Sequence, residues 1–228
     1  MHTTNITPEQ KNLMRKIINC FENGRTETDY SSIYIYKDGP NDIRALTLGF
    51  GLTEYGNLKT LIKNYIDAAG VFAEDFRKYV NLIGRIPLTD NKAFIELLVK
   101  SAKLDPIFRQ CQDAIFELMY FAPAIAYFNK GGYKEILSAM IILDSFIHSG
   151  SMPSFLVSRF PERSPANGGD EKTWMKQYVA TRRSWLSKHS RTILRKTVYR
   201  MAFFEAQFNK NNWSLNLPLN ANGINITQ

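Results

Sequence analysis

Two acidic residues near the start of the chain have the types and surroundings of an acid/base pair. Glu22 follows an apolar helical stripe, and Asp38 opens an Asp-Gly turn after a short alternating segment. The negative end of the helix dipole and the apolar side chains Phe21 and Phe50 disfavour the ionised form of Glu22, whereas a polar turn leaves Asp38 ionised. A carboxylic acid and a carboxylate in such different surroundings are typical of glycoside hydrolases.

Each of the two carboxyls also has an ordinary explanation. A Glu before Asn-Gly is often a surface residue, and Asp-Gly is often only a turn. Asp42, four residues further along the same turn, is an alternative base. From spacing alone, catalysis is a hypothesis.

The element that carries Glu22 is predicted to be a helix. Thr7 is the expected N-cap, Pro8 the first helical residue and Gln10 the partner in a capping box. Apolar residues then recur at helical spacing, and Gly24 is placed as a C-cap.

The element that carries Asp38 is predicted to be a strand pair. Residues 33–36 and 46–48 alternate with period two around the turn-rich segment 38–42. We expect this pair to be the only sheet.

The rest of the chain has mostly helical periodicity, so the expected fold class is mainly α (α+β). A loop at 149–169 is rich in Ser, Pro, Gly and Arg, and the polar tail 216–228 is expected on the surface. The predicted helices cover residues 57–69, 71–83, 90–103, 106–120, 123–130, 133–148, 171–188 and 190–210.

Charge is unevenly distributed along the chain. The formal net charge is +8, and residues 115–228 hold 14 basic against 7 acidic residues. From Lys172 to Arg200 there are nine basic residues and no acidic one. Such a stripe either attracts polyanions or forms a solvated helical face.

Several function classes are excluded or disfavoured. No uncharged apolar run reaches the roughly 20 residues of a membrane span, so we expect none. Cys20, Cys111 and scattered histidines do not form a metal-binding pattern, and we expect buried free thiols, no metal and no cofactor. The first residues do not have the pattern of a signal peptide.

A series of motifs, in order, resembles glycoside hydrolase family 46, the chitosanases. The series begins with Phe21-Glu22-Asn23-Gly24 and continues with Asp38-Gly39 and Gly49-Phe50. The later members are Phe108-Arg109-Gln110-x-Gln112-Asp113, Tyr120-x-x-Pro123-Ala124, Asp144-x-x-Ile147-His148-Ser149-Gly150, 168–171 ahead of Trp174, and Asn216-x-Pro218-Leu219.

The resemblance implies a lysozyme-like fold of two lobes within a single catalytic domain, 1–228. The small β-containing lobe would comprise roughly 25–56 with adjacent helices. Glu22 would be the acid and Asp38 the base of an inverting reaction, with their carboxyls at or beyond the upper end of the inverting range of about 6.5–9.5 Å.

The resemblance also implies a buried salt-bridge network behind the acid, made by Asp144, Arg182 and Arg200. The residue pattern agrees, because Asp144 follows the apolar run 140–143 and would need cationic partners if buried.

Two departures from the family bear on the substrate. Pro40 to Arg44 replace the family's Arg-Gly-Tyr-Thr, so Thr47 is only a candidate for positioning the water. The acidic residue that the family carries beyond Gly-Phe is absent or replaced by Asn57, with Glu54 nearby. The candidate substrate contacts are Asn23, Tyr36, Arg44, Glu54 and His148, although a capping or core role is favoured for His148.

Because chitosan is a polycation and this chain is basic, the sequence favours peptidoglycan glycan strands as the substrate, with a muramidase or lysozyme activity. A true chitosanase is the alternative, and a non-enzymatic polyanion or nucleic-acid binding module is the second. The expected partner is a polysaccharide, with no nucleic acid, an immunity protein as a further partner and a monomeric state. The expected place of action is outside the producing cell, by secretion or by delivery to the envelope of a target cell.

Overall fold

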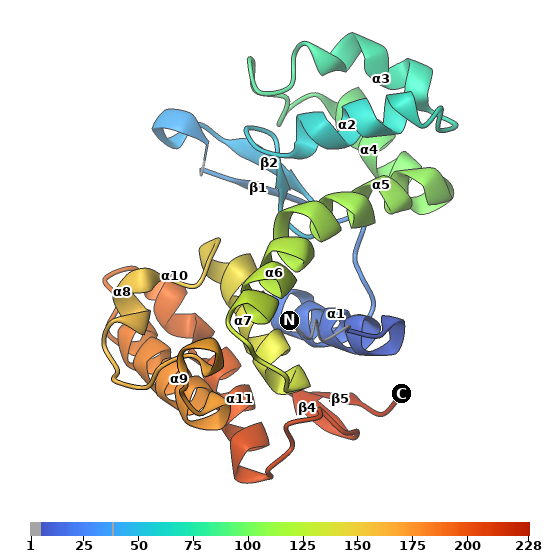
Figure 1. The fold of residues 1–228 in the computed structure, drawn as a ribbon. Helices are drawn as coiled ribbons and strands as arrows, with labels where there is room; N and C mark the ends of the chain where they lie inside the picture. The colour runs from blue at the N-terminus through green and yellow to red at the C-terminus, as the bar shows by residue number, and fades with distance from the viewer. Residues whose placement is uncertain (1–5, 38) are drawn as a thin grey trace. The chain divides into compact units, whose positions relative to one another are not determined.

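The computed structural model describes residues 6–37 and 39–228 (Figure 1). The chain divides into two compact units. Unit 1 consists of Met1–Glu27 with Met119–Gln228, and unit 2 is the inserted segment Thr28–Leu118. Helices dominate and the sheets are small and antiparallel, so the predicted fold class is confirmed.

Unit 2 contains a three-stranded antiparallel sheet and four helices. The strands are β1 (Ile33–Tyr36), β2 (Ala45–Leu48) and β3 (Leu52–Thr53), paired in the order β1-β2-β3. The helices are α2 (Leu58–Asp67), α3 (Ala73–Val80), α4 (Lys92–Leu104) and α5 (Pro106–Phe116). The predicted strand pair is confirmed, with Tyr34 opposite Thr47.

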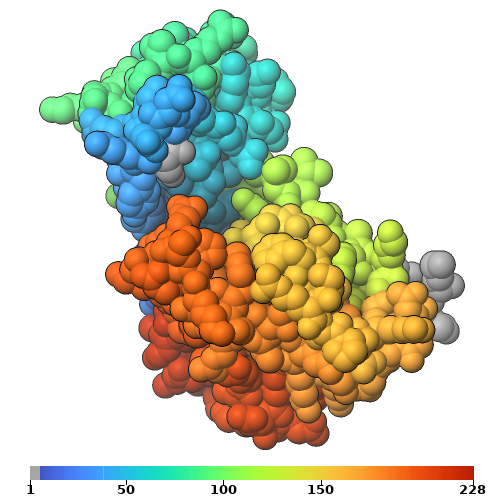
Figure 2. All heavy atoms as spheres, turned by 90° about the vertical axis from the view of Figure 1, so that its left-hand side faces the viewer, coloured from blue at the N-terminus to red at the C-terminus, as the bar shows by residue number. Residues whose placement is uncertain are grey.

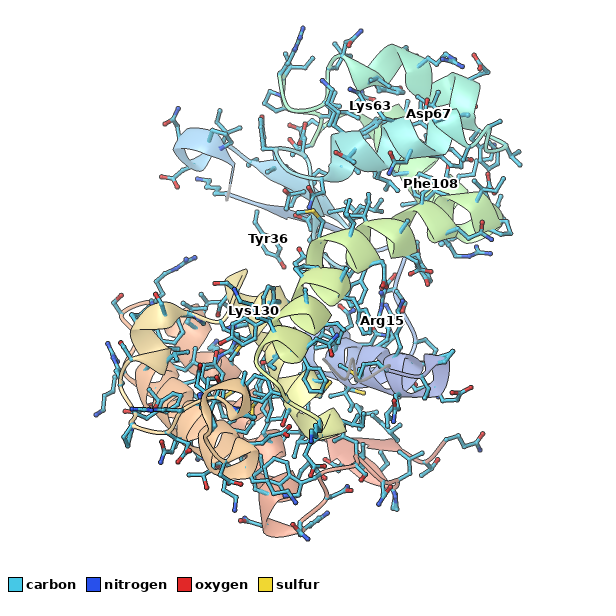
Figure 3. All side chains as sticks on the ribbon, viewed as in Figure 1. Arg15, Tyr36, Lys63, Asp67, Phe108 and Lys130 are labelled. Carbon is cyan, nitrogen blue, oxygen red and sulfur yellow. The ribbon has the colours of Figure 1, made fainter. Side chains whose placement is uncertain are left out.

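The core of unit 2 contains a cluster of aromatic rings among aliphatic side chains. Phe108 lies on α5 (Figure 3). Its ring stacks with that of Phe76 at 5.9 Å, and Tyr65 meets it edge-on at 4.8 Å. The Tyr65 hydroxyl donates to the buried Asp105 carboxylate, which also accepts from the backbone of Val71 and caps α5. One buried carboxylate thereby joins three segments of the unit.

Unit 1 is built from helices at both ends of the chain. The long helices are α1 (Pro8–Asn23), α6 (Ala122–Lys130), α7 (Ile136–Ser149), α9 (Glu171–Ser187) and α11 (Tyr199–Asn209). The short ones are α8 (Ser154–Val157), η3 (Pro165–Asn167), α10 (Thr192–Arg195) and η4 (Lys196–Val198). A π-helical turn, η2 (Glu117–Phe121), precedes α6, and η1 (Pro40–Asp42) lies in unit 2.

The central helix of unit 1 is α7. Nine consecutive residues, 137–145, are buried, and α7 packs against α1, α6, α9 and α11. A helix that is apolar on all sides is a helix surrounded by protein, so any charge on it must be neutralised from within.

The predicted ends of α1 are confirmed. Thr7 and Gln10 form the capping box, and Gly24 adopts the left-handed conformation with φ 66°. Only a residue without a Cβ takes this φ at low cost. The position of Glu22 near the helix end is therefore specified locally.

The prediction of a single sheet was wrong. The polar tail contains a second antiparallel hairpin, β4 (Leu219–Ala221) and β5 (Ile224–Ile226), in which Leu219 and Ile226 are buried. Asn222 and Gly223 both have positive φ, as a two-residue hairpin turn requires.

Other expectations can be compared with the described residues. The 149–169 loop is partly ordered by α8 and η3, and both cysteines are buried free thiols, as predicted. Among residues 6–37 and 39–228, no helix is long and apolar enough to span a membrane.

Candidate active site

Glu22 lies in the last turn of α1 with a side chain that is 38% exposed. Its Oε1 accepts a hydrogen bond from Nη2 of Arg200 at 2.5 Å. Arg200 is almost completely buried, so the cation contacts the carboxyl from the protein side and leaves the other side open. A carboxyl held in this way keeps its orientation and remains accessible to a ligand.

The same arginine binds a second carboxylate. Nη1 of Arg200 donates to Oδ1 of Asp144 at 2.7 Å, and Asp144 is completely buried on α7. Burial by itself lowers the pKa of Arg200, but the charges of Asp144 and Glu22 outweigh this effect and raise it above its ordinary value. Arg200 is therefore a permanent cation between two acids.

Arg182 completes the group from α9. Its Nη1 lies 3.5 Å from Oδ2 of Asp144, and both side chains are fully buried. This contact is an ion pair without hydrogen-bond geometry, since neither atom has a hydrogen-bond partner among the described residues. Two guanidinium groups and two acidic side chains thus form a charged chain, Glu22–Arg200–Asp144–Arg182, and the contacts expected within the salt-bridge network are present.

His148 extends this chain at the end of α7. Its Nδ1 lies 3.1 Å from Nη2 of Arg182, and Oγ of Ser149 lies 3.4 Å from the same nitrogen. Burial, followed by the charges of Arg200 and Arg182, lowers the pKa of His148 to about 4. At neutral pH the ring is uncharged, so Nδ1 accepts from Arg182 and Nε2 carries the hydrogen.

Aromatic residues support the turn that carries Glu22. The Tyr199 hydroxyl donates to the backbone carbonyl of Phe21, and the Phe21 ring meets Phe203 edge-on at 5.4 Å. Burial and then Glu22 raise the pKa of Tyr120. Neither Tyr120 nor Tyr199 was among the predicted site residues. In the sequence, only the Tyr120-x-x-Pro123 motif pointed to Tyr120. Tyr199 is identified only by its contact with the backbone of Phe21 in the folded chain.

The predicted residues of the β turn lie in unit 2. Asp38, the predicted base, is outside the described residues. Asp42 is exposed at the end of η1 with φ 58°, and Thr47 is half-buried on β2. The roles of these residues stay predictions.

The predicted substrate contacts have varied surroundings. Tyr36 is 58% exposed and its ring stacks with that of Tyr34 at 6.1 Å. Arg44 is exposed and pairs with Asp90 at 3.1 Å. Asn23 is half-buried, with an amide nitrogen that has no hydrogen-bond partner among the described residues.

Glu54 has a structural role in place of the expected sugar contact. It is 1% exposed, and its carboxylate accepts from the backbone nitrogens of Leu46 and Leu88. Desolvation raises the pKa of Glu54, although these two hydrogen bonds oppose the shift. A carboxylate occupied by two backbone donors inside unit 2 is not available to a substrate.

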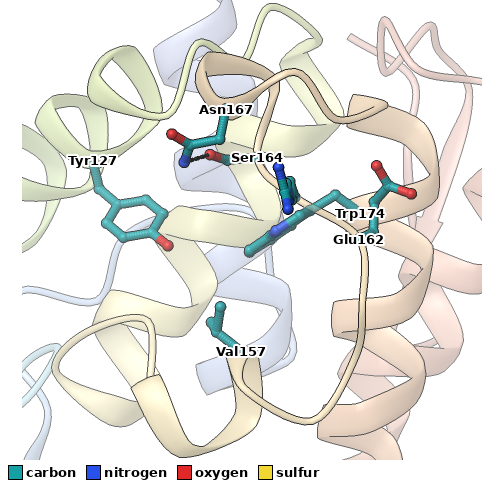
Figure 4. A pocket seen from close by; sticks show the side chains of 7 residues that line it. Tyr127, Val157, Glu162, Ser164, Asn167 and Trp174 are labelled. Carbon is teal, nitrogen blue, oxygen red and sulfur yellow. Dashed lines mark hydrogen bonds between the residues drawn. The ribbon is translucent and has the colours of Figure 1, made fainter.

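Two of the cavities on unit 1 are lined in part by residues of α8. One of about 430 Å³ is lined by His148 and by the rings of Phe155 and Trp185. The other, of about 570 Å³, has Tyr127 and Trp174 among its lining residues (Figure 4).

Polar groups around the larger cavity bind each other. Glu162 accepts from the backbone of Asp170, and Asn167 donates to Ser164. The larger cavity is therefore part of a loop scaffold, whereas the smaller one adjoins the charged chain. In the described part of the protein, no three His, Cys, Asp or Glu side chains are grouped as a metal site would require.

Removing the buried carboxylate tests the charged chain. Asp144→Ala leaves two buried arginines with a single carboxylate, so we expect the free energy of unfolding to fall by roughly 3–5 kcal/mol. Chemical denaturation monitored by circular dichroism measures this loss. As a control, Glu205→Ala breaks the partly exposed ion pair with Arg183 and should cost no more than about 1 kcal/mol. Equal losses in the two variants would contradict the inference that Asp144 neutralises buried cations.

The histidine makes stability depend on pH. The unfolded chain binds a proton at His148 near pH 6.5 and the folded chain only near pH 4, so the free energy of unfolding should fall as the pH drops through this interval. His148→Gln removes this titration and should flatten the decline by up to about 3 kcal/mol. Denaturation curves at several pH values provide the measurement, and identical slopes in the variant and the wild type would refute the assignment.

Comparison with known proteins extends over nearly the whole chain. A chitosanase from Bacillus subtilis (strain 168) is 27% identical over 233 residues, which cover 94% of this chain and 82% of that protein. The solved native chitosanase from Bacillus subtilis MY002 has a TM-score of 0.82 at 24% identity, covering 98% of this chain and 100% of that one. A mutant chitosanase from the same source, solved in complex with 6 GlcN, has a TM-score of 0.82 at 25% identity, with 97% and 99% covered.

The sequence model of glycosyl hydrolase family 46 matches residues 16–219 of this chain. This range includes Glu22 and every member of its charged chain, and the predicted resemblance is confirmed. The protein belongs to glycosyl hydrolase family 46 and is a glycosidase.

Proposed function

We propose that the protein is a chitosanase that hydrolyses the β-1,4 bonds of chitosan by inverting acid/base catalysis. The observation that carries the proposal is the half-open Glu22 carboxyl, bound from the protein side by the buried Arg200. The family match supports a glycosidase. The relatives found by sequence and by structure are described as chitosanases, and they support chitosan as the substrate.

The sequence favoured peptidoglycan, and the comparisons give that preference no support. The preference for peptidoglycan depended on the net charge of the whole chain. Because salt screens exposed charges beyond about 8–10 Å, the total charge says little about the groups that contact a bound sugar. The alternative, chitosan, is the better supported substrate.

In the proposed reaction Glu22 donates its proton to the leaving glycosidic oxygen. Arg200 keeps the carboxyl in one orientation, and Asp144 keeps Arg200 in place. Asp38 takes a proton from the attacking water, and Thr47 helps to position that water. Asn23, Tyr36, Arg44 and His148 are proposed to contact the sugar chain.

Other properties stay predictions with no observation beyond the sequence. These are the monomeric state, an immunity protein as a partner, and secretion or delivery to the envelope of a target cell. Because chitosan is an extracellular polymer, we propose action outside the producing cell.

Removal of the acid tests the proposed chemistry. Glu22→Gln retains the size of the side chain but cannot donate the proton, so turnover of chitosan should fall by roughly 10²–10⁴-fold. Mass spectrometry of the products gives the rate. The matched control, Glu27→Gln, changes an exposed glutamate of unit 1 and should retain wild-type turnover.

Three results would overturn the proposal. The first is more than a tenth of wild-type turnover in Glu22→Gln. The second is cleavage of peptidoglycan but not of chitosan in parallel digests. The third is a first-formed product with retained anomeric configuration in an NMR time course, since an inverting enzyme releases the opposite anomer.

The identity of the base needs a separate experiment. Asp38→Asn should abolish turnover because water is no longer deprotonated, whereas Asp42→Asn should leave it nearly unchanged. Chitosan hydrolysis by the two purified variants decides between them. Loss only in Asp42→Asn would move the base along the turn, and full activity in both variants would mean that neither carboxylate is required.

A further inference from the structure

Positive charge is concentrated in unit 1. This unit contains 18 Lys and Arg against 9 Asp and Glu, whereas unit 2 contains 11 against 12. The proposed substrate, chitosan, is a polycation, so binding of chitosan does not account for the excess. The positive charge of unit 1 therefore either binds a different, anionic partner or has no binding role.

The excess gathers in the segment that follows α9. Lys188, Arg191, Arg195 and Lys196 are exposed within nine residues around α10. Arg195 orders the turn, because its guanidinium donates to the carbonyls of His189 and Ser190 and to the Thr192 hydroxyl.

The other three cations have no acidic partner. In the described part of the chain, Lys188, Arg191 and Lys196 form no ion pair. Arg183 lies about one helix turn before Lys188, on α9. By contrast with the three cations, it is paired with Glu205 of α11. Unpaired exposed cations lose little hydration when an anionic partner arrives, so they are available for binding.

An aromatic cavity adjoins these cations. The cavity of about 430 Å³ is lined by Phe155 and Trp185, whose rings meet edge-on at 5.5 Å, and by Leu194 of α10. Phe155 is 44% exposed. The remaining lining residues include three serines, Ser149, Ser151 and Ser154.

The cavity is lined by Phe155 of α8 and Leu194 of α10, so it adjoins the segment that carries the cations. Figure 2 shows the α8 segment, in yellow, beside the orange segment that includes α10. Apolar rings with a few hydroxyl groups suit the faces and hydroxyls of sugar rings. Cations next to such a cavity suit a sugar that also bears an acid group.

We propose that this face, defined by Phe155, Trp185, Lys188, Arg191 and Lys196 and called here the α8–α10 surface, binds an anionic glycan polymer. The cations pair with acid groups along the polymer, and the aromatic rings pack against its sugar rings. An anionic wall polymer also attracts chitosan, so an enzyme held there is kept near its polycationic substrate. The binding itself does not depend on which glycan is cleaved.

The test measures binding of the full chain to polygalacturonate, a carboxylated glycan. The neutral glycan dextran, duplex DNA and vesicles that contain phosphatidylglycerol are measured in parallel. We expect polygalacturonate to bind most tightly, with an affinity that falls as salt is raised. Equal binding of dextran, or tighter binding of DNA or of the vesicles, would overturn the proposal.

The variants locate the site. Replacing Lys188, Arg191 and Lys196 together by Gln should weaken binding by about tenfold, because each exposed ion pair with the polymer contributes only a little on its own. The matched control replaces Lys63, Lys92 and Lys103, which are exposed in unit 2, and removes the same total charge. It should bind within about twofold of the wild type. Equal loss in both triple variants would show that net charge, and not this surface, binds the polymer.

Two further measurements test the aromatic contact and the independence of polymer binding from chitosan cleavage. Phe155→Ala should weaken binding of polygalacturonate but not of duplex DNA, and an unchanged affinity for polygalacturonate would exclude the aromatic contact. Both triple variants should hydrolyse short chitosan oligomers at the wild-type rate. If the wild type does not cleave chitosan, the proposed function is wrong, but the binding measurements still show whether the α8–α10 surface binds the anionic glycan. Thermal unfolding of each variant checks that it is folded.

Discussion

Arg200 must satisfy two carboxylates at once, one buried and one at the surface, and the arrangement of unit 1 depends on this requirement. Its two terminal nitrogens lie 2.7 Å from Asp144 and 2.5 Å from Glu22. Asp144 belongs to α7, Glu22 to α1 and Arg200 to α11. The contacts therefore fix three helices, one from each end of the chain and one from its middle, around a single guanidinium.

A buried network of this kind is costly to desolvate, and it need not stabilise the fold more than apolar residues would. What it provides is a unique geometry. An apolar core tolerates small shifts of one helix against another, whereas a guanidinium with two carboxylate partners satisfies both over a narrow range of positions. The result is a surface carboxyl whose orientation is set by the core, and a positioned acid needs this property.

How far the sequence predicts these features depends on whether their cause is local. The capping box at Thr7 and the left-handed Gly24 were predictable because side chain and backbone interact within one helix turn. Asp144 was placed inside the protein because it follows an apolar run. Its partners came from the resemblance, since Arg182 and Arg200 are 38 and 56 residues away in the sequence.

The errors have the opposite cause. Glu54 has no local sign of burial, and its partners are backbone nitrogens, of which Leu88 lies 34 residues away. A backbone donor leaves no trace in the residue types, so the glutamate was wrongly expected to face the substrate. The β4–β5 hairpin could have been predicted, because Asn222-Gly223 is a strong turn signal. Its asparagines made the segment resemble a polar tail, although Leu219 and Ile226 alternate inward.

The charge of the chain shows why position matters more than totals. Of the nine cations between Lys172 and Arg200, two are buried partners of Asp144, and another is paired with Glu205. The stripe read from the sequence is therefore not one surface but several groups with different environments. Arg182 and Arg200 serve the carboxyl at Glu22, while the unpaired cations around α10 face solvent. Because salt screens interactions between exposed charges over about 8–10 Å, each group acts on what lies next to it. A basic chain can therefore belong to a family whose relatives are chitosanases, because the residues proposed to contact the sugar lie outside this basic stripe.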